Sequence, residues 1–154
     1  MIERKLILPP RPERSFFLWG PRQVGKTSLL KHAYPSTLRL DLLRAEVRMQ
    51  YATAPNLLRE QLQTLPKKSL TVIDEVQLVP ELLHEVHWLI EERNLVFALC
   101  GSSARKLRHG AANLLGGRAL RYELHGFVSA ELGDDFDLTR ILNRGYLPPL
   151  YFEA

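Results

Sequence analysis

A glycine-rich segment near the amino terminus carries the most specific chemical pattern in the chain. Residues 20–27, GPRQVGKT, fit the spacing G-x-x-x-x-G-K-[ST], and the apolar run SFFLW (15–19) comes directly before them. Glycines at this spacing let the backbone turn tightly, so that successive N–H groups point at a phosphate. A helix that begins after the loop adds the positive end of its dipole. The segment therefore predicts a loop that binds the phosphates of a nucleotide.

Two side chains of this loop have separate predicted tasks. Lys26 is placed to reach the outer phosphates, and the Thr27 hydroxyl is placed to ligate Mg²⁺. The alternative is an ordinary glycine turn with a solvated lysine, but the strand-like run before the motif and the helical pattern after it favour the phosphate loop. The predicted nucleotide-binding residues are Gly20, Pro21, Arg22, Gln23, Val24, Gly25, Lys26, Thr27 and Ser28.

Two adjacent acidic residues follow a second apolar run, LTVI (70–73). Asp74, at the tip of a buried strand, can hold Mg²⁺ through the water shell of the ion, together with Thr27. Glu75 can orient and deprotonate a water molecule aimed at the terminal phosphate. Two acids after a strand usually form a turn. Beside a phosphate loop, they predict a magnesium ligand and a general base.

Two further segments offer polar groups whose roles stay open. Ser102 and Ser103 follow an apolar run, where a hydroxyl could sense the terminal phosphate or hold the attacking water. A serine that caps the next helix explains the same residues equally well. Arg118 follows a Gly-Gly turn, and its guanidinium suits the charge of a transferring phosphoryl group, although a solvated arginine fits as well. The candidate catalytic residues are Glu75, Ser102, Ser103 and Arg118.

The elements that must position these residues alternate between strand-like and helix-like patterns. Helical patterns follow the loop (26–32), Pro55 and Pro80, and short helices are expected at 128–132 and 138–142. Strands separated by helices predict an α/β fold of the P-loop NTPase class, with a five-stranded, mainly parallel sheet sandwiched between helices. The expected strands are 15–19, 37–41, 70–74, 95–100 and 120–124.

Composition excludes few function classes. The chain has 154 residues, 45% of them hydrophobic and 25% charged, which suits one ordinary folded domain. No apolar run is long enough to span a bilayer, and the first residues lack a signal-peptide pattern. The lone Cys100 fits a reducing cytoplasm. A net charge of +4 suits a nucleotide ligand as well as a nucleic acid, so it identifies neither.

Four segments together resemble a known family. They are GPRQVGKTSLL (20–30), LDL (40–42), IDEVQLVPELL (73–83) and CGSSARKLRHGAANLLGGRALRYEL (100–124). They resemble the AAA-type P-loop ATPases of the AAA_14 family, in which the ATPase segment is commonly followed by a domain of unknown function, DUF4143. The resemblance covers about residues 14–150.

This resemblance implies a bacterial or archaeal cytoplasmic protein that binds ATP with Mg²⁺ and hydrolyses it. The loop glycines, Lys26 and Thr27 carry over as the nucleotide loop, and Asp74 with Glu75 as the acidic pair. It also implies a sensor role for Ser102 or Ser103 and a phosphate-facing role for Arg118. It supplies no substrate or client.

The last segment, GYLPPLYFEA (145–154), resembles the junction at which a further domain begins in longer family members. We therefore expect residues 1–154 to form one ATPase domain, with residues 125–154 starting a connection to an absent C-terminal domain. Two prolines argue against a regular helix across the whole end segment. Because that segment is rich in aromatic residues, we expect it to expose an apolar patch, to promote self-association and to accompany slow turnover.

Two function classes remain from the sequence. The first is an ATPase that couples Mg-dependent hydrolysis to movement of a partner or C-terminal domain. The alternative is a nucleotide-dependent binding switch with little turnover, with nucleic acid as a possible target. A small-molecule kinase is disfavoured because Glu75 is placed as a water-activating base and no acceptor-pocket motif stands out. The other expected partners are a second copy of the chain and an unidentified protein client, and no membrane partner is expected.

Overall fold

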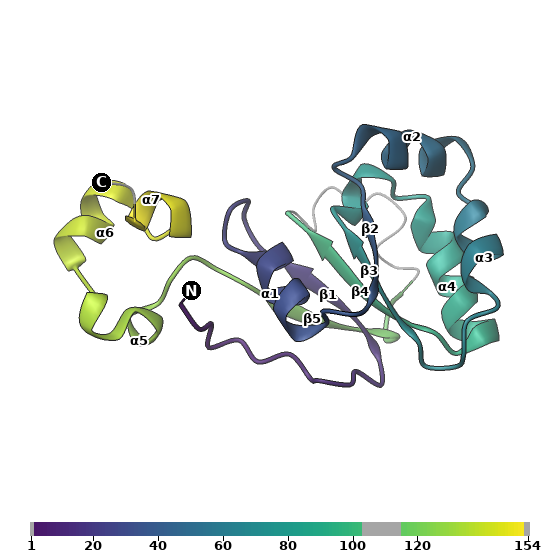
Figure 1. The fold of residues 1–154 in the computed structure, drawn as a ribbon, viewed down its shortest axis with the longest axis horizontal. Helices are drawn as coiled ribbons and strands as arrows, with labels where there is room; N and C mark the ends of the chain where they lie inside the picture. Colours follow the sequence, from purple (N-terminus) through teal and green to yellow (C-terminus); the bar gives the residue numbers. More distant parts are fainter. Residues whose placement is uncertain (1, 103–114, 153–154) are drawn as a thin grey trace.

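The computed structural model describes residues 2–102 and 115–152, and it is built around one five-stranded sheet (Figure 1). The strands are β1 (Ser15–Trp19), β2 (Leu38–Asp41), β3 (Leu70–Asp74), β4 (Val96–Gly101) and β5 (Ala119–Glu123). Their order is β2-β3-β4-β1-β5, and every pairing is parallel. All strands therefore end at the same edge of the sheet, and that edge collects the residues that follow β1, β3 and β4.

The five predicted strands and the parallel fold class are confirmed. Each strand lies within one residue of its predicted bounds at both ends. β4 lies between β1 and β3, so the acidic strand and the strand before the glycine loop are not neighbours. β3 and β4 are buried along almost their whole length because helices cover both faces of the sheet.

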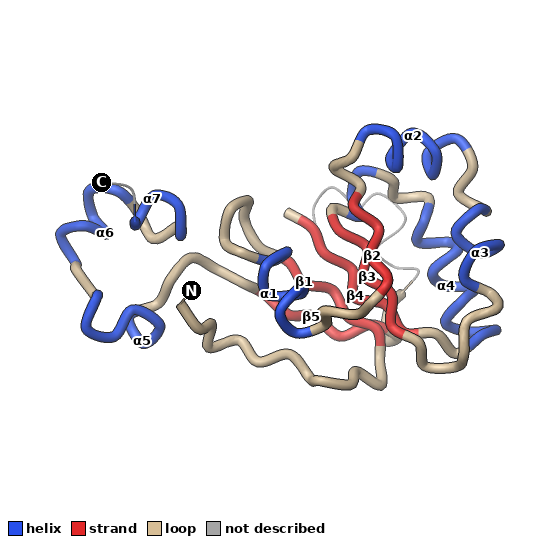
Figure 2. The backbone as a smooth tube through the Cα atoms, viewed as in Figure 1, coloured by secondary structure: helices blue, strands red, loops and turns tan. Residues whose placement is uncertain are grey.

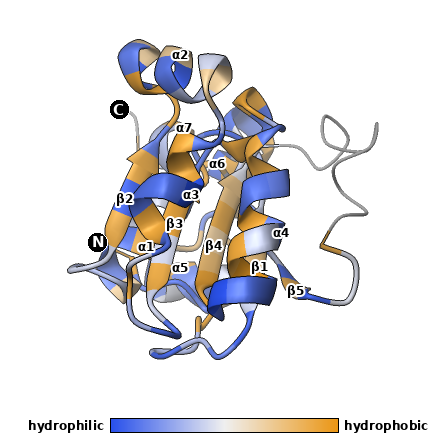
Figure 3. Ribbon diagram, turned by 90° about the vertical axis from the view of Figure 1, so that its right-hand side faces the viewer, coloured by the Kyte–Doolittle hydropathy of each residue, from blue (hydrophilic) through white to orange (hydrophobic). Residues whose placement is uncertain are grey.

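Alternate strand residues build two separate apolar layers. Phe16 and Leu18 of β1 pack on one face with Leu30 of helix α1 (Lys26–Ala33). Phe97 and Leu99 of β4 pack on the opposite face, with side chains of helices α3 (Leu57–Leu62) and α4 (Leu82–Arg93). Figure 3 shows the strands mostly in hydrophobic colours and hydrophilic residues on the helices that cover them. The sheet is therefore fixed from both sides.

Two short elements lie near the strand ends that form the site. Helix α2 (Ala45–Thr53) follows β2, and the 3₁₀ helix η1 (Val76–Leu78) follows β3. The sequence pattern did not predict α2, because Tyr51 is its only buried residue and it has no apolar stripe.

After β5 the chain leaves the sheet and forms a small helical lobe (Figure 2). Its elements are α5 (Ser129–Leu132), the 3₁₀ helix η3 (Gly133–Asp135), α6 (Leu138–Arg144) and α7 (Pro148–Phe152). Phe127, Leu132 and Tyr151 form a core of its own. The short helices expected at 128–132 and 138–142 are present. The expectation against a regular helix at the end is correct only for the segment as a whole, because α7 begins at Pro148, where the first helical turn tolerates proline.

The amino-terminal segment, residues 2–10, runs back beside α1 to this lobe (Figure 1). Leu8 is buried against the α1 face of the sheet, and the Tyr34 hydroxyl donates to the Pro9 carbonyl oxygen at 2.8 Å. The segment thus links the sheet domain and the lobe. Within residues 2–102 and 115–152, no helix has the length and apolar content needed to cross a membrane.

Candidate functional site

The glycine loop connects β1 to α1 at the carboxyl edge of the sheet. A Cβ at Gly20 would overlap the carbonyl oxygen of Leu124, so only glycine fits where the loop leaves β1. Gly25 has φ 94°, in the left-handed region that favours glycine, and it caps α1. Gly20 is therefore required by the close approach of the Leu124 carbonyl oxygen, and Gly25 by its left-handed backbone conformation. The loop backbone and the amino end of α1 lie together, as an anion-binding loop requires.

Lys26 is the buried cation of the loop. Its side chain is only 5% exposed, and its Nζ donates to the carbonyl oxygens of Gly20 and Pro21, both at 2.7 Å. These neutral acceptors balance the charge only in part. The ammonium group therefore remains a strong partner for an anion that enters the loop.

Thr27 and Asp74 bring the two predicted motifs into direct contact. Thr27 Oγ1 donates to Asp74 Oδ2 at 2.6 Å across 47 residues of sequence. Asp74 is 2% exposed, and its Oδ1 has no hydrogen-bond partner within the described parts of the chain. A hydroxyl beside a buried carboxylate with a spare oxygen is a donor set that suits Mg²⁺.

Cys100 lies next to this carboxylate in the buried end of β4. Burial raises the pKa of the Cys100 thiol, and the nearby Asp74 carboxylate raises it further. The thiol therefore stays protonated and behaves as a small buried hydrophobe, as expected from the sequence.

Glu75 and Ser102 lie together through a third side chain. Glu75 is almost buried and has φ 57°, a left-handed conformation that turns the chain sharply after β3. Gln77 Nε2 donates to Glu75 Oε2 and also to Ser102 Oγ, the latter at 3.1 Å. The structure thus brings two of the predicted catalytic residues together. Ser103 lies outside the described residues.

Arg118 is not brought to this edge of the sheet. It precedes β5, whose first residue, Ala119, pairs with Ser15 at the opposite edge. Five residues of strand separate the two edges, which is roughly 16 Å. The Arg118 guanidinium is 42% exposed and forms an ion pair with Glu91 of α4, and this hydrogen bond lowers the pKa of the Glu91 carboxyl.

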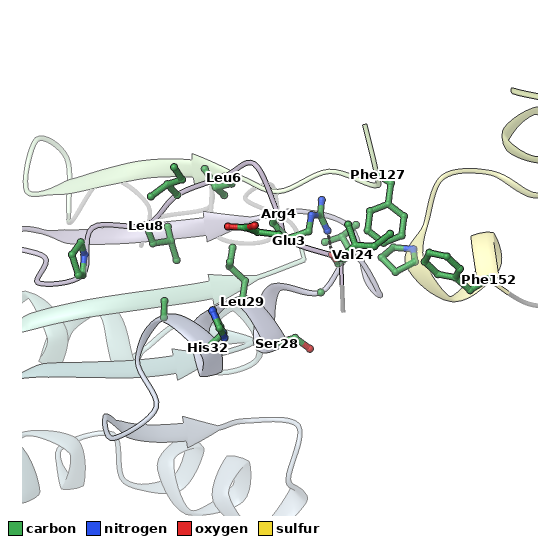
Figure 4. Close-up of a pocket in the computed structure, with 16 residues that line it drawn as sticks. Glu3, Arg4, Leu6, Leu8, Val24, Ser28, Leu29, His32, Phe127 and Phe152 are labelled. Carbon is green, nitrogen blue, oxygen red and sulfur yellow. Dashed lines mark hydrogen bonds between the residues drawn. The ribbon is translucent and has the colours of Figure 1, made fainter. Parts of the chain in front are cut away.

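A largely apolar cavity of about 740 Å³ adjoins the loop (Figure 4). Val24, Gly25 and Ser28 form its loop side, and Leu29 and His32 of α1 continue it. The amino-terminal segment and the helical lobe complete the wall, including Leu6, Leu8, Phe127 and Phe152. Sequence reasoning missed this cavity because three segments far apart in the chain form it.

Arg4 joins these three segments at one point, although no sequence motif marks it. Its guanidinium donates to the carbonyl oxygens of Val24 and His125, both at 2.6 Å, and to Glu131 Oε1 at 3.0 Å. It also lies over the Phe127 ring, 5.2 Å from the centroid. Figure 4 shows Arg4 close to both Val24 and Phe127. One side chain thus connects the loop to the start of the lobe.

Comparisons with known proteins identify a family and a fold. A family model described as AAA domain, AAA_14, matches residues 12–133. The fold is similar to that of a RuvB variant from Thermotoga maritima, with a TM-score of 0.54 and 16% identity over 79% of this chain and 41% of that chain. Among curated proteins, none matches the sequence significantly.

Two proteins from Aeropyrum pernix are similar to about the same degree. The ORC1 protein in complex with DNA has a TM-score of 0.53 and 16% identity, over 79% of this chain and 42% of that chain. The ORC2 protein in its ADPNP-ADP complexes has a TM-score of 0.53 and 15% identity, over 78% and 44%. The chain spans less than half the length of these proteins, and at this identity the likeness establishes the P-loop NTPase fold alone.

Proposed function

The chain belongs to the AAA domain family AAA_14, and from that membership we propose that it binds Mg-ATP at residues 20–28 and hydrolyses it. The family supports nucleotide binding, and hydrolysis by this chain is the further step of the proposal. The observation that carries it is the 2.6 Å hydrogen bond from Thr27 to Asp74, which joins the glycine loop to the acidic strand. In this proposal the Thr27 hydroxyl, the free Oδ1 of Asp74 and the buried Lys26 ammonium group all contact the same bound Mg-ATP.

Each loop residue has a binding task in this proposal. The backbone N–H groups of residues 20–25 and the amino end of α1 hold the phosphates. Lys26 exchanges the carbonyl oxygens of Gly20 and Pro21 for the outer phosphates, which are charged and therefore stronger acceptors. Thr27 and Asp74 would hold Mg²⁺, which when bound neutralises charge on those phosphates.

We assign the apolar cavity beside Val24 and Gly25 to the base and ribose of the nucleotide. It adjoins the phosphate loop on the side of the amino-terminal segment, and its lining suits a flat heterocycle. The amino-terminal segment and the lobe would then both contact the bound nucleotide.

Glu75 and Ser102 supply the chemistry at the terminal phosphate. Glu75 takes a proton from a water molecule while the water oxygen bonds to the terminal phosphorus and the bond to the ADP oxygen breaks. The Ser102 hydroxyl donates to a terminal phosphate oxygen. Arg118 has a role only across a contact between two chains, since its own site lies at the far edge of the sheet.

A nucleotide-dependent switch with little turnover is the second candidate, and the Arg4 contacts favour it. Because Arg4 bonds both Val24 of the loop and Glu131 of the lobe, a nucleotide that moves the loop also acts on the lobe. The same link could couple hydrolysis to a protein client, a second copy of the chain or a nucleic acid. A cytoplasmic location, indicated by the lone cysteine, remains part of the proposal.

The test is cleavage of ATP in a single turnover, with the protein in excess over radiolabelled Mg-ATP. We expect the parent chain to release phosphate from ATP with no acceptor present. Glu75→Gln should keep ATP binding and cleave about 10²- to 10⁴-fold more slowly, because an amide cannot take a proton from water. Glu81→Gln, the same change at an exposed glutamate of the following segment, is the matched control.

Binding without cleavage in the parent chain would favour the switch over the ATPase. Cleavage of ATP only after a small acceptor is added, with the radiolabelled phosphoryl group on the acceptor and not released as phosphate, would favour a kinase. Equal cleavage by the parent and Glu75→Gln would remove Glu75 from the mechanism.

A further inference from the structure

The side chain of Gln77 lies between two candidate catalytic residues that come from different strands. Gln77 belongs to η1, after β3, and it is almost fully buried. Its one amide nitrogen donates both to the Glu75 carboxylate and to Ser102 Oγ, the latter at 3.1 Å. Glu75 follows β3 and Ser102 follows β4, so the amide bridges the ends of two neighbouring strands.

The Glu75 carboxylate fixes the orientation of this amide. The reverse orientation would place the amide oxygen beside a carboxylate oxygen, and two acceptors in contact repel each other. With the nitrogen in place, its two N–H groups serve Glu75 and Ser102, one each. The hydrogen bonds therefore have a defined direction.

That direction sets what each partner can do at the terminal phosphate. Ser102 Oγ accepts from Gln77, so the hydroxyl proton of Ser102 is left to donate to another group. Glu75 accepts from Gln77 through Oε2, and its remaining lone pairs are left to accept a proton. Ser102 can then donate to a phosphate oxygen and Glu75 can accept a proton from water, as the proposed hydrolysis requires.

The end of β4 makes room for this bridge. A Cβ at Gly101 would overlap both Gln77 Oε1 and the Trp19 ring, so glycine at this position lets the amide cross the strand end. Gln77 Oε1 itself is buried and has no hydrogen-bond partner among the described residues. An orphaned acceptor costs free energy, so packing alone would be served better by an apolar side chain of the same length.

From these observations we propose that Gln77 is a positioning residue, which holds the side chains of the general base Glu75 and the phosphate-sensing Ser102 at a fixed position relative to each other. This assignment rests on the proposed hydrolysis at the same site. Gln77 makes no contact with the reacting atoms in this assignment and acts through its two partners.

The experiment compares Gln77→Met with the parent chain in single-turnover cleavage of Mg-ATP and in binding of a fluorescent, non-hydrolysable ATP analogue. Methionine keeps the length and bulk of glutamine but donates no hydrogen bond. We expect cleavage to slow by about 10²-fold, the effect of a small misplacement of a catalytic group, while the Kd changes less than about 2-fold. Leu78→Met, a change of a half-buried apolar side chain in the same turn, is the control: it keeps the backbone hydrogen bond from the Leu78 N–H to the Glu75 carbonyl oxygen and should cleave at the parent rate.

A second pair of variants separates positioning from a structural role. Because Gln77 acts through Glu75 and Ser102, Gln77→Met should have no further effect on the residual rate when Glu75→Gln and Ser102→Ala are both already present. A structural role would lower the rate in both backgrounds and would weaken analogue binding and thermal stability together.

Three outcomes decide the matter. Loss of rate with intact binding, and no added effect where Glu75→Gln and Ser102→Ala are both present, supports the assignment. A parent chain that cleaves ATP while Gln77→Met cleaves it equally fast overturns the Gln77 assignment and leaves the proposed function standing. A parent chain that binds the analogue but never cleaves ATP overturns the proposed hydrolysis and the assignment with it.

Discussion

Asp74 and Glu75 are adjacent carboxylates with different surroundings. Asp74 ends β3 in an extended strand and receives the Thr27 hydroxyl. Glu75 has φ 57° and ψ 43°, a conformation that costs a residue other than glycine roughly 1–3 kcal/mol. This turn sends the second carboxylate toward Gln77 and Ser102 instead of toward Thr27. Strain at this position is consistent with a division of labour between the two acids.

We expect Asp74→Asn to change the magnesium dependence of ATP binding. An amide keeps the shape of the side chain but loses the charge that would hold the ion, so more Mg²⁺ should be needed to reach half-maximal ATP affinity. The measurement is ATP affinity across a magnesium titration. Asp41→Asn is the control, since Asp41 ends the neighbouring strand and accepts from the Leu43 N–H. An Asp74→Asn curve identical to the parent curve would remove Asp74 from the ion site.

The strands, and the carboxyl edge of the sheet at which the site lies, were predicted correctly from the sequence. Buried parallel strands give continuous apolar runs with acids or glycine at their ends, and the motif glycines have local backbone reasons that spacing reveals. The helix α2 was missed because its residues carry no periodic apolar face. Prediction therefore succeeds for the strands, whose burial produces a regular apolar pattern, and fails for α2, whose burial produces none.

The contacts of the amino-terminal segment could not be predicted from the sequence. Arg4 and Glu131 are 127 residues apart, and neither stands in a motif. Gln77 was overlooked for a related reason, because its role depends on which strands are neighbours in space. Arg118 shows the reverse problem: its residue type suited phosphate, but the register of β5 carries it to the far edge of the sheet. The positions of these side chains depend on which strands and segments are neighbours in the folded chain, and no local sequence pattern shows that.

We expect the contact between the amino-terminal segment and the lobe to weaken at acid pH. Burial alone would raise the pKa of the Glu131 carboxyl, but hydrogen bonds from the Lys5 N–H, the Arg4 guanidinium and the Val128 N–H lower this pKa overall. Because the pKa of this carboxyl is lower in the folded chain than its ordinary value of 4.5, the carboxylate stabilises the fold at pH values above about 4.5. This stability is lost as the pH falls through the pKa of the folded state.

Glu131→Gln tests this dependence by comparing thermal stability from pH 7 to pH 3.5. The variant should be less stable than the parent by roughly 2 kcal/mol at pH 7, and the two should converge at the acid end because the parent carboxylate becomes protonated. Glu123→Gln, at an exposed ion pair, should follow the parent throughout. A constant difference between Glu131→Gln and the parent across the whole range would contradict the assignment.

At the scale of the whole molecule, the helical lobe leaves much apolar surface uncovered. Among the described residues of its aromatic end segment, 145–152, only Tyr151 is fully buried. The exposed large apolar side chains of the lobe are Val128, Phe136, Leu138, Leu142, Tyr146, Leu150 and Phe152. Surface of this kind promotes association. Contact between copies would also give Arg118 its only route to a nucleotide.

We therefore expect the ATP cleavage rate per chain to rise with protein concentration, in step with the mass measured by light scattering. Arg118→Ala should leave ATP affinity nearly intact and flatten this rise, since an arginine supplied by another chain contributes up to about 10³- to 10⁵-fold in related chemistry. Arg121→Ala, at a nearby exposed ion pair, is the control. A monodisperse monomer whose rate is independent of concentration and of Arg118 would contradict this prediction.

Calorimetric titration of the chain with Mg-ATP measures whether Mg-ATP binds at the glycine loop, on which every role proposed for the site depends. We expect saturable binding of one ATP per chain, and we expect Lys26→Ala to lose it because the buried ammonium group is removed. Lys31→Ala, which removes an exposed lysine of the same helix, should keep the parent affinity. Equal affinity of Lys26→Ala and the parent chain would contradict binding at the glycine loop.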